Sequence, residues 1–266
     1  MVTRFEPGRG FLLSSVCGIL TALAIAPVML AQSQRPPAPD QPVETVVADP
    51  LQSSFPLPWK WIEDGHAAAV KAKKPLRFTQ QTPQYLSPDG RYVAQATLYF
   101  RADPEAQRQQ LVSVLEIRDR QSGSQQQIES LKEMPPEFLA EVPPGQGLIA
   151  VLVPVGWSAT GNRLLVRQVG GLFATDLISD GAWIWQAGVG HVATVYPTAE
   201  EYDFATLLGW STTDPQRVLF QTQTMGNPKV TIWAVDTQGS TQLAQGDRPR
   251  VYGTTLPATA NAQRRP

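Results

Sequence analysis

From about residue 83 onward, short apolar runs alternate with polar turns, and one phrase of this kind occurs three times. Its copies are Leu86–Ala94 (LSPDGRYVA), Gly156–Val166 (GWSATGNRLLV) and Gly209–Phe220 (GWSTTDPQRVLF). In each copy a serine and turn-forming residues precede an apolar run. A phrase that recurs at intervals of about one supersecondary unit predicts a repeat architecture.

The runs around these phrases predict strands joined by short turns. The expected strands are 91–99 and 110–118 in the first unit, 163–169, 172–177 and 182–186 in the second, and 207–210, 217–224, 229–236 and 240–245 in the third. In the second unit the breaks are placed at Gly170-Gly171 and at Ser179–Gly181. Four antiparallel strands in a repeat correspond to one blade of a β-propeller.

The turn residues resemble those of TolB-type and WD40-like propeller repeats. The third unit carries Trp210-Ser211 before its second strand and Asp236 before Gly239-Ser240; the first has Ser87–Gly90, and the second has Trp157-Ser158 with Gly161. The resemblance covers roughly residues 83–247. It implies a propeller-like scaffold and an accessory role in envelope assembly or transport, but it assigns no functional residue.

The expected fold is therefore mainly β, with about three recognisable four-stranded blades and short helical inserts. Propellers have about four to eight blades, so three blades leave the ring open unless something completes it. A degenerate blade from 59–81, a second copy of the chain, or an open stack capped by helices are the alternatives. An open stack exposes edge strands, which favours a binding partner.

Two helical segments and two core tryptophans complete the expected scaffold. Acidic residues followed by lysines predict a helix from Glu63 to about Lys73. The stretch 128–141 reads as short helical turns broken by prolines, with apolar residues expected to pack on the sheet. Trp157 and Trp210 are expected to fill the spaces between adjacent blades.

The amino-terminal region predicts export. Arg4 and Arg9 precede an uncharged stretch, so residues 1–31 form a signal peptide or an uncleaved membrane anchor. Cys17, the only cysteine, lies inside this stretch. The expected organisation continues with a proline-rich flexible linker at 32–58, the propeller-like domain at 59–252 and a flexible tail at 253–266. The location is then the periplasm or another compartment outside the cytoplasm.

Composition narrows the class of protein. The chain has 266 residues, 42% of them hydrophobic, and a formal net charge of -1. This length and content can bury a sizeable core, which argues against global disorder. The balanced charge provides no field that would attract a polyanion, so nucleic acid is not an expected partner.

The chemistry-bearing residues form no recognisable motif. His66 and His191 stand in unrelated contexts, and the serines of the repeats lie in turns and not in a nucleophile elbow. The sequence assigns no catalytic, cofactor-binding or metal-binding residue and no cofactor, and it leaves the binding residues unknown. An acid pair could still be assembled from distant carboxylates, namely Glu63, Asp64, Glu200 and Asp203.

The sequence thus favours an exported, non-enzymatic module that binds a protein or an envelope component. One alternative is a hydrolase or lyase acting on a sugar or peptide in a propeller funnel, which would need carboxylates or His191 to converge. Another is a structural accessory subunit of a membrane complex. Membrane association is expected only through residues 1–31, if they are retained, and oligomerisation stays open.

Overall fold

The computed structural model describes residues 49–257. The expected signal or anchor at 1–31, with Cys17, and most of the expected linker lie outside these residues. Within residues 49–257, no helix combines the length and the apolar character needed to cross a membrane.

The fold is mainly β and consists of three successive four-stranded antiparallel meanders, as expected. The first contains β2 (Gln84–Leu86), β3 (Tyr92–Ala102), β4 (Gln110–Asp119) and β5 (Gln125–Glu129); the second contains β6 (Leu148–Trp157), β7 (Arg163–Leu172), β8 (Ile178–Gln186) and β9 (Gly190–Val195); the third contains β10 (Phe204–Ser211), β11 (Val218–Gln223), β12 (Val230–Val235) and β13 (Thr241–Leu243). We call them the first, second and third meanders.

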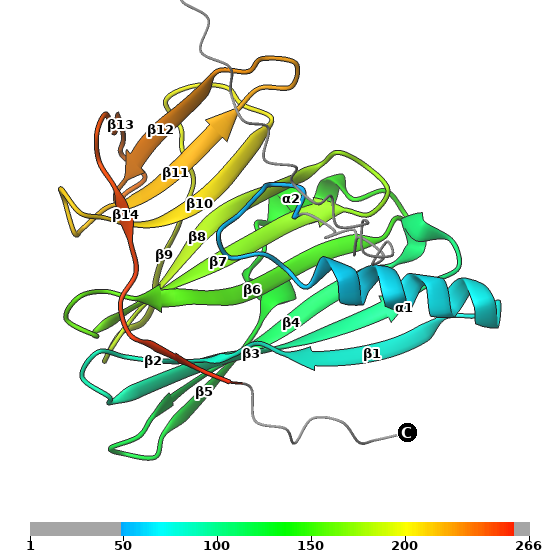
Figure 1. The fold of residues 1–266 in the computed structure, drawn as a ribbon, viewed down its shortest axis with the longest axis horizontal. Coiled ribbons are helices and arrows are strands. Elements are labelled where there is room, and N and C mark those ends of the chain that lie inside the picture. The colour runs from blue at the N-terminus through cyan, green and yellow to red at the C-terminus, as the bar shows by residue number, and fades with distance from the viewer. Residues whose placement is uncertain (1–48, 258–266) are drawn as a thin grey trace, which may run out of the picture. The chain divides into compact units, whose positions relative to one another are not determined.

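The meanders do not close into a ring. Residues 110–112 of β4 pair in parallel with residues 148–150 of β6, which merges the first two meanders into one ten-stranded sheet. The third meander belongs to a separate five-stranded sheet (Figure 1). The larger sheet has the order β15-β2-β3-β4-β6-β7-β8-β9, and its two ends are not joined. The propeller-like arrangement is therefore open.

A carboxy-terminal strap, residues 249–256, connects the first strands of all three meanders. Its strand β14 (Pro249–Arg250) pairs with β10, Tyr252 forms a bridge with Trp157 of β6, and β15 (Thr254–Leu256) pairs with β2. Figure 1 shows this segment in red, running from the third meander to β2. The packed domain thus extends to Leu256, beyond the expected limit at 252.

The repeated phrase forms equivalent turns between the first and second strands of each meander. The backbone N–H of Ser158 donates to the Arg163 carbonyl at 2.8 Å, and the Ser87 and Ser211 N–H groups make corresponding bonds at 2.9 and 3.0 Å. Gly90 and Gly161 have φ angles of +71° and +74°. Glycine adopts this left-handed conformation without a Cβ clash, which explains its place in these turns.

The tryptophans of the phrase lie in the core, as expected. Trp157 is fully buried and Trp210 is 2% exposed. Trp157 packs between the first two meanders, with ring centroids 5.8 Å from Tyr92 and 6.1 Å from Trp185. Trp210 packs with Leu165 and other apolar residues between the second and third meanders. The Trp157 contacts add to the backbone pairing between the first two meanders, and the Trp210 contacts help to join the two separate sheets.

The segment 59–81 forms a helix and one additional strand, so it does not supply a fourth blade. Helix α1 spans Trp59–Ala72 and begins earlier than expected. Strand β1 (Leu76–Gln81) pairs with the end of β3, and Gly65 of the helix packs against the Phe78 and Phe100 rings. The core between α1 and the sheet buries enough apolar surface to fix this extension.

The second meander departs most from the sequence-based expectation. Residues 173–177, expected within a strand, connect β7 to β8, whereas Gly170-Gly171 and Ser179–Gly181 lie inside β7 and β8. A Cβ at Gly181 would lie 2.5 Å from the Tyr196 ring, so this glycine marks close packing and not a turn. Strand β6, which the sequence analysis did not predict, is buried along its whole length.

The amino-terminal end of the described chain, residues 49–58, is also part of the packed domain. Leu51 and Leu57 lie in the core. The Arg167 guanidinium, buried in β7, binds the Asp49 carboxylate through Nη1 at 3.0 Å and the Asp180 carboxylate through Nε at 2.8 Å. This ionic cluster fastens the segment to the second meander, so residues 49–58, expected to belong to the flexible linker, pack with the domain.

Candidate functional site

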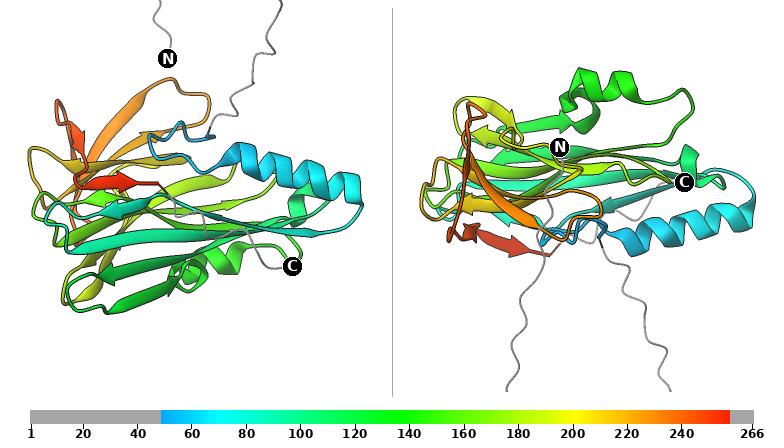
Figure 2. Two further views of the ribbon diagram at one scale, coloured as in Figure 1. Left: turned by 60° about the horizontal axis from the view of Figure 1, so that its bottom comes forward. Right: turned by 90° about the horizontal axis from the view of Figure 1, so that it is seen from above.

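A pocket of about 460 Å³ lies beside the second meander, where three segments meet. These are the insert around α2 (Pro136–Glu141), the strands β7 and β8, and the connection from β9 to β10. Figure 2 shows α2 and α1 on opposite faces of the large sheet. The pocket is therefore on the face away from α1.

Hydrogen bonds from buried groups fix the insert on the sheet. Ser130, at the start of the 3₁₀ turn η2 (Ser130–Glu133), donates its hydroxyl to the Ala150 carbonyl at 2.6 Å. Gln168 Nε2 donates to the Glu133 carbonyl at 2.6 Å, and Trp183 Nε1 donates to Glu133 Oε2 at 3.0 Å. These bonds place the helix that follows at a defined position.

The apolar residues of the insert pack back on the sheet, as expected. Met134 is 4% exposed and lies in a cluster with Phe138, Leu139 and Leu148. Gly170, in β7, faces the Phe138 ring, from which an added Cβ would be 3.5 Å away. Because this strand position has no side chain, space remains between the ring and the sheet. The pocket thus has an apolar floor.

Polar groups inside the pocket bind one another. The Tyr196 hydroxyl donates to Gln168 Oε1 at 2.7 Å, and the Ser179 hydroxyl accepts the Ala205 N–H at 3.2 Å. Burial raises the pKa of Tyr196 most, and the nearby Tyr202 and Glu137 raise it further, so its phenol stays protonated at neutral pH. Gln168 is 1% exposed and holds the phenol in place, so the Tyr196 oxygen can accept a hydrogen bond from a ligand at a fixed position.

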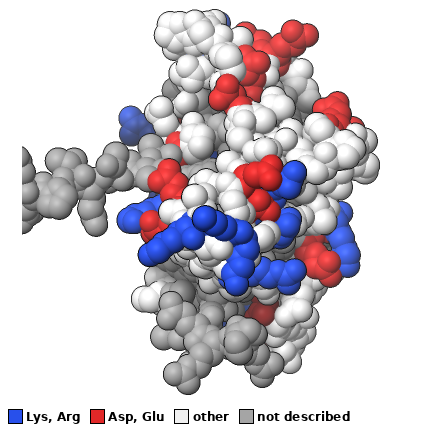
Figure 3. Space-filling model, turned by 90° about the vertical axis from the view of Figure 1, so that its right-hand side faces the viewer, with Lys and Arg blue, Asp and Glu red and all other residues white. Residues whose placement is uncertain are grey.

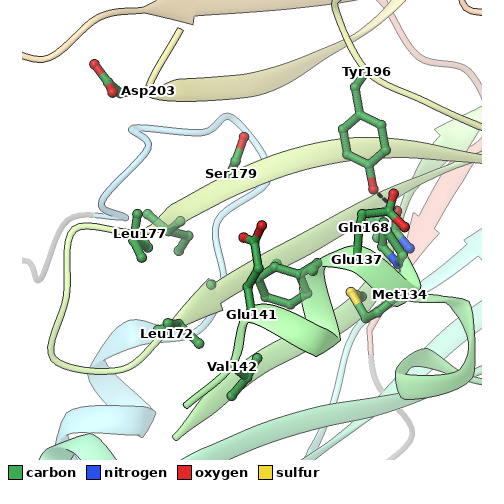
Figure 4. Close-up of a pocket in the computed structure, with 15 residues that line it drawn as sticks. Met134, Glu137, Glu141, Val142, Gln168, Leu172, Leu177, Ser179, Tyr196 and Asp203 are labelled. Atoms are coloured by element: carbon green, nitrogen blue, oxygen red, sulfur yellow. Dashed lines mark hydrogen bonds between the residues drawn. The ribbon is translucent and has the colours of Figure 1, made fainter. Parts of the chain in front are cut away.

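All charged side chains that line the pocket are acidic. They are Glu137 and Glu141 on α2, and Asp203 just before β10. Figure 4 shows the two glutamates on the helix side, and Ser179 and Asp203 across from them. None of the described residues that line it is Lys, Arg or His. The pocket therefore combines an apolar floor with a negative rim.

The residues considered for catalysis lie in different parts of the fold. His66, on α1, contacts the Asp103 carbonyl at 3.0 Å through Nδ1, and Glu63 and Asp64 are exposed on the same helix. Glu200 and Asp203 lie in the connection from β9 to β10, and Asp203 lines the pocket. In the part of the chain that the structure describes, no three His, Cys, Asp or Glu side chains form a group suited to a metal ion.

His191 has a packing partner of its own. Its ring stacks on the buried Trp183 ring at a centroid distance of 4.7 Å, and Nε2 lies 3.1 Å from the Thr194 hydroxyl. Glu133 Oε2 is 3.9 Å from its Nδ1. The glutamate also accepts the Trp183 hydrogen bond, so its position follows from the anchoring of the insert. These contacts indicate a packing role for His191, whose ring covers the Trp183 ring.

A basic region, in contrast to the acidic pocket, lies where α1 ends. Lys71, Lys73, Lys74 and Arg77 are exposed at the end of α1 and the start of β1. Figure 3, which views the side where α1 ends, shows basic side chains gathered there. Cations at the carboxyl end of a helix interact favourably with the helix dipole. That role accounts for the lysines without a ligand.

Comparisons with known proteins give no family assignment. No family model matches the chain, and no curated protein matches it. Solved structures similar to it include the β-propeller domain of the Trilobed protease from Pyrococcus furiosus, with a TM-score of 0.35 and 14% identity over 65% of this chain and 44% of that one. Another is the Pyrococcus horikoshii acylaminoacyl peptidase, with a TM-score of 0.33 and 12% identity over 65% of this chain and 26% of that one.

The matched region thus spans less than half of either solved chain. At these scores the similarity carries no argument about activity. The propeller-like description of this chain rests on its own three meanders, and its functional site rests on the geometry of the pocket.

Among the polar residues of the pocket, the sequence pattern points to Asp203, as one of four carboxylates distant in sequence, but not to Gln168 or Tyr196. Gln168 follows Arg167 inside an otherwise apolar run, which is an unusual place for a polar pair and was the available signal. The sequence pattern places Ser179 in a turn and gives no signal at Tyr196. Their proximity depends on how the insert folds back, which no local pattern in the sequence encodes.

Proposed function

We propose that this protein is an exported, non-enzymatic binding module and that the pocket beside α2 holds part of its protein partner. The observation that carries the proposal is the pocket itself: about 460 Å³, with an apolar floor and a few fixed polar groups. Ligand pockets of proteins generally have volumes of about 300–1,000 Å³ and this type of lining. Export rests on the character of residues 1–31.

The finer parts of the proposal come from the sequence. The resemblance to TolB-type propellers supports an accessory role at the cell envelope. In the pocket, Glu137, Glu141 and Asp203 do not form a group suited to a metal ion. A hydrolase or lyase in a central funnel is the alternative. It is less favoured because the strap, residues 249–256, runs along the first strands of the meanders, where a funnel would be expected.

A pocket-dependent capture experiment tests this function. The tagged full-length chain is isolated from its own envelope fraction, and co-purifying proteins are quantified by mass spectrometry. Leu177→Trp places a large ring at the rim of the pocket, at a position that is 64% exposed. Val189→Trp is the matched control, because Val189 is also 64% exposed but lies in the turn between β8 and β9.

We expect a stoichiometric partner that is retained by the wild type and by Val189→Trp and is lost in Leu177→Trp. Equal melting temperatures of the two variants show that the loss is not due to unfolding. A partner retained by Leu177→Trp would contradict the assignment of the pocket. The amino terminus of the isolated protein, read in the same experiment, tests export: a full-length cytoplasmic protein would contradict it.

A further inference from the structure

We infer that the pocket recognises a basic apolar segment of a peptide, in which one Lys or Arg side chain is flanked by apolar side chains. This inference rests on the proposed binding function and adds the chemistry of the ligand. It is carried by the charge of the rim, by the apolar floor and by the lack of internal partners for two carboxylates.

The charge of the rim is of one sign. Glu137 and Glu141 are both exposed on one short helix, and Asp203 belongs to the facing connection. Figure 4 shows the Glu141 carboxylate pointing away from its helix, in the direction of Ser179. Three carboxylates around one cavity repel one another, and a bound cation relieves this repulsion.

Within the described part of the chain, Glu137 and Glu141 have no ion-pair partner on their own helix or beside it, unlike Glu105 and Glu129. Glu105 forms an ion pair with Arg108 at 3.0 Å, and Glu129 forms one with Lys132 at 2.9 Å. No ion pair involves Glu137 or Glu141 among the described residues. Their carboxylates therefore keep their capacity to accept hydrogen bonds from a ligand.

Asp203 has a partial structural role. Its Oδ2 accepts the Met225 N–H at 2.6 Å, which leaves the other oxygen for a ligand. The raised pKa of Tyr196, to which burial contributes most and the nearby Glu137 also contributes, agrees with a negative potential in the pocket. We assign the attraction of a cation mainly to the two glutamates.

The floor selects for apolar groups beside the cation. Met134, Phe138 and Leu172 come from the insert and from β7, and Leu177 extends the apolar surface to the rim. A simple inorganic cation would leave this surface in contact with water. A peptide with apolar side chains beside a basic one covers it and places the charge at the rim, since Lys and Arg have long apolar stems.

The test is an NMR titration of the full-length protein with blocked tripeptides, acetyl-Leu-X-Leu-amide. Here X is lysine, its uncharged analogue norleucine, or glutamate. 2-Phenylethylamine is included as a free organic amine of similar polarity. Amide shifts locate the binding site, and their concentration dependence gives the affinity at low and at moderate salt.

We expect the lysine peptide to shift amides around the pocket and to bind about tenfold more tightly than the norleucine peptide, as two partly exposed ion pairs would give. The double variant Glu137→Gln/Glu141→Gln should abolish this difference. The control Glu63→Gln/Asp64→Asn, with the same change of charge on exposed positions of α1, should preserve it. Added salt should weaken the binding of the lysine peptide.

Other outcomes overturn the inference. Equal binding of the norleucine and lysine peptides at the pocket would refute the charge selection but leave the proposed binding function intact. Tighter binding of the glutamate peptide than of the lysine peptide would also refute the charge selection, because the preferred charge would then be negative. If 2-phenylethylamine binds as tightly as the lysine peptide, the occupant is a free amine and not a peptide. If no probe shifts any pocket amide, this ligand chemistry is refuted, while the capture experiment still judges the binding function separately.

Discussion

Replacing Arg167 tests the buried ionic cluster that fastens the amino-terminal segment to the second meander. The side chains of Arg167 and Asp180 have no exposed surface, and that of Asp49 is 2% exposed. Arg167 Nη1 also donates to the Phe55 carbonyl at 2.8 Å, and Asp180 Oδ2 accepts the Leu207 N–H at 3.0 Å. One arginine therefore connects residues 49–58, β7 and β8, and Asp180 extends the connection to β10.

The change to make is Arg167→Met, which keeps much of the apolar stem and removes the charge. Removing one partner of a buried ion pair typically costs about 3–5 kcal/mol, because the other charge stays buried without compensation. Here two carboxylates lose their only cationic partner among the described contacts, so we expect a loss near the upper end. Domains are stable by about 5–15 kcal/mol, and such a loss is a large part of that.

The pH dependence of the stability lost in Arg167→Met distinguishes uncompensated buried carboxylates from a simple loss of packing. Burial raises the pKa of Asp180 even with Arg167 in place, whereas the charge and hydrogen bonds of Arg167 outweigh burial and lower that of Asp49. Without the arginine, both folded-state pKa values should rise above the unfolded value. Such groups stabilise the fold fully only below the unfolded pKa and lose this contribution as pH rises. The loss should therefore be smaller at pH 4 than at pH 7.

The assay is urea unfolding of the full-length protein followed by tryptophan fluorescence at both pH values. Arg108→Met is the control, because its ion pair with Glu105 is more than half exposed on the arginine side and should contribute less than about 1 kcal/mol. A loss below about 1 kcal/mol for Arg167→Met, or an equal loss at pH 4 and pH 7, would refute the reasoning.

Three further predictions concern the strap, a turn carboxylate and the histidines. In urea unfolding, Gly253→Ala should destabilise the fold by about 2 kcal/mol more than Gly246→Ala. Both glycines have a positive φ, but of the two only Gly253 would have its added Cβ overlap neighbouring backbone. Equal losses of stability would argue against a tightly packed strap. Burial would raise the pKa of Asp247, but hydrogen bonds from turn hydroxyls and N–H groups lower it to about 2. The stability that Asp247 contributes should therefore be present above about pH 4 and be lost as the pH falls to 2. Melting temperatures of Asp247→Asn should depend less on acid pH than those of the wild type, and an unchanged dependence would contradict this role of Asp247. His66→Ala and His191→Ala should leave partner capture unchanged, and a large loss in either would favour the enzyme alternative.

The local pattern of the sequence was sufficient for the third meander. All four of its strands were expected near their observed positions, and the turn phrase was recognised in all three meanders. Turn chemistry is local: the serine of the repeated phrase bonds to a residue five or six positions further along the chain. The burial of Trp157 and Trp210 also followed from their place in this phrase.

The second meander shows where local reasoning fails. The sequence pattern places turns at Gly170, Gly171 and Gly181, but these glycines lie in strands that other chain segments approach closely. The same glycine can serve a turn or a close approach, and only the neighbours in space distinguish the two. Strand β6, buried on both faces, has no polar alternation, and it was not predicted.

The sequence by itself determined the mainly β class, the three repeats, their turns and the core role of their tryptophans, because these depend on residue types within a few positions of one another. The tertiary structure alone decided that the repeats stay open, that residues 249–256 connect their first strands, and that Asp49 meets Arg167. It also decided the pocket, since Glu137, Gln168 and Tyr196 come from three separate segments. Such contacts depend on the path of the whole chain, which a local pattern does not specify.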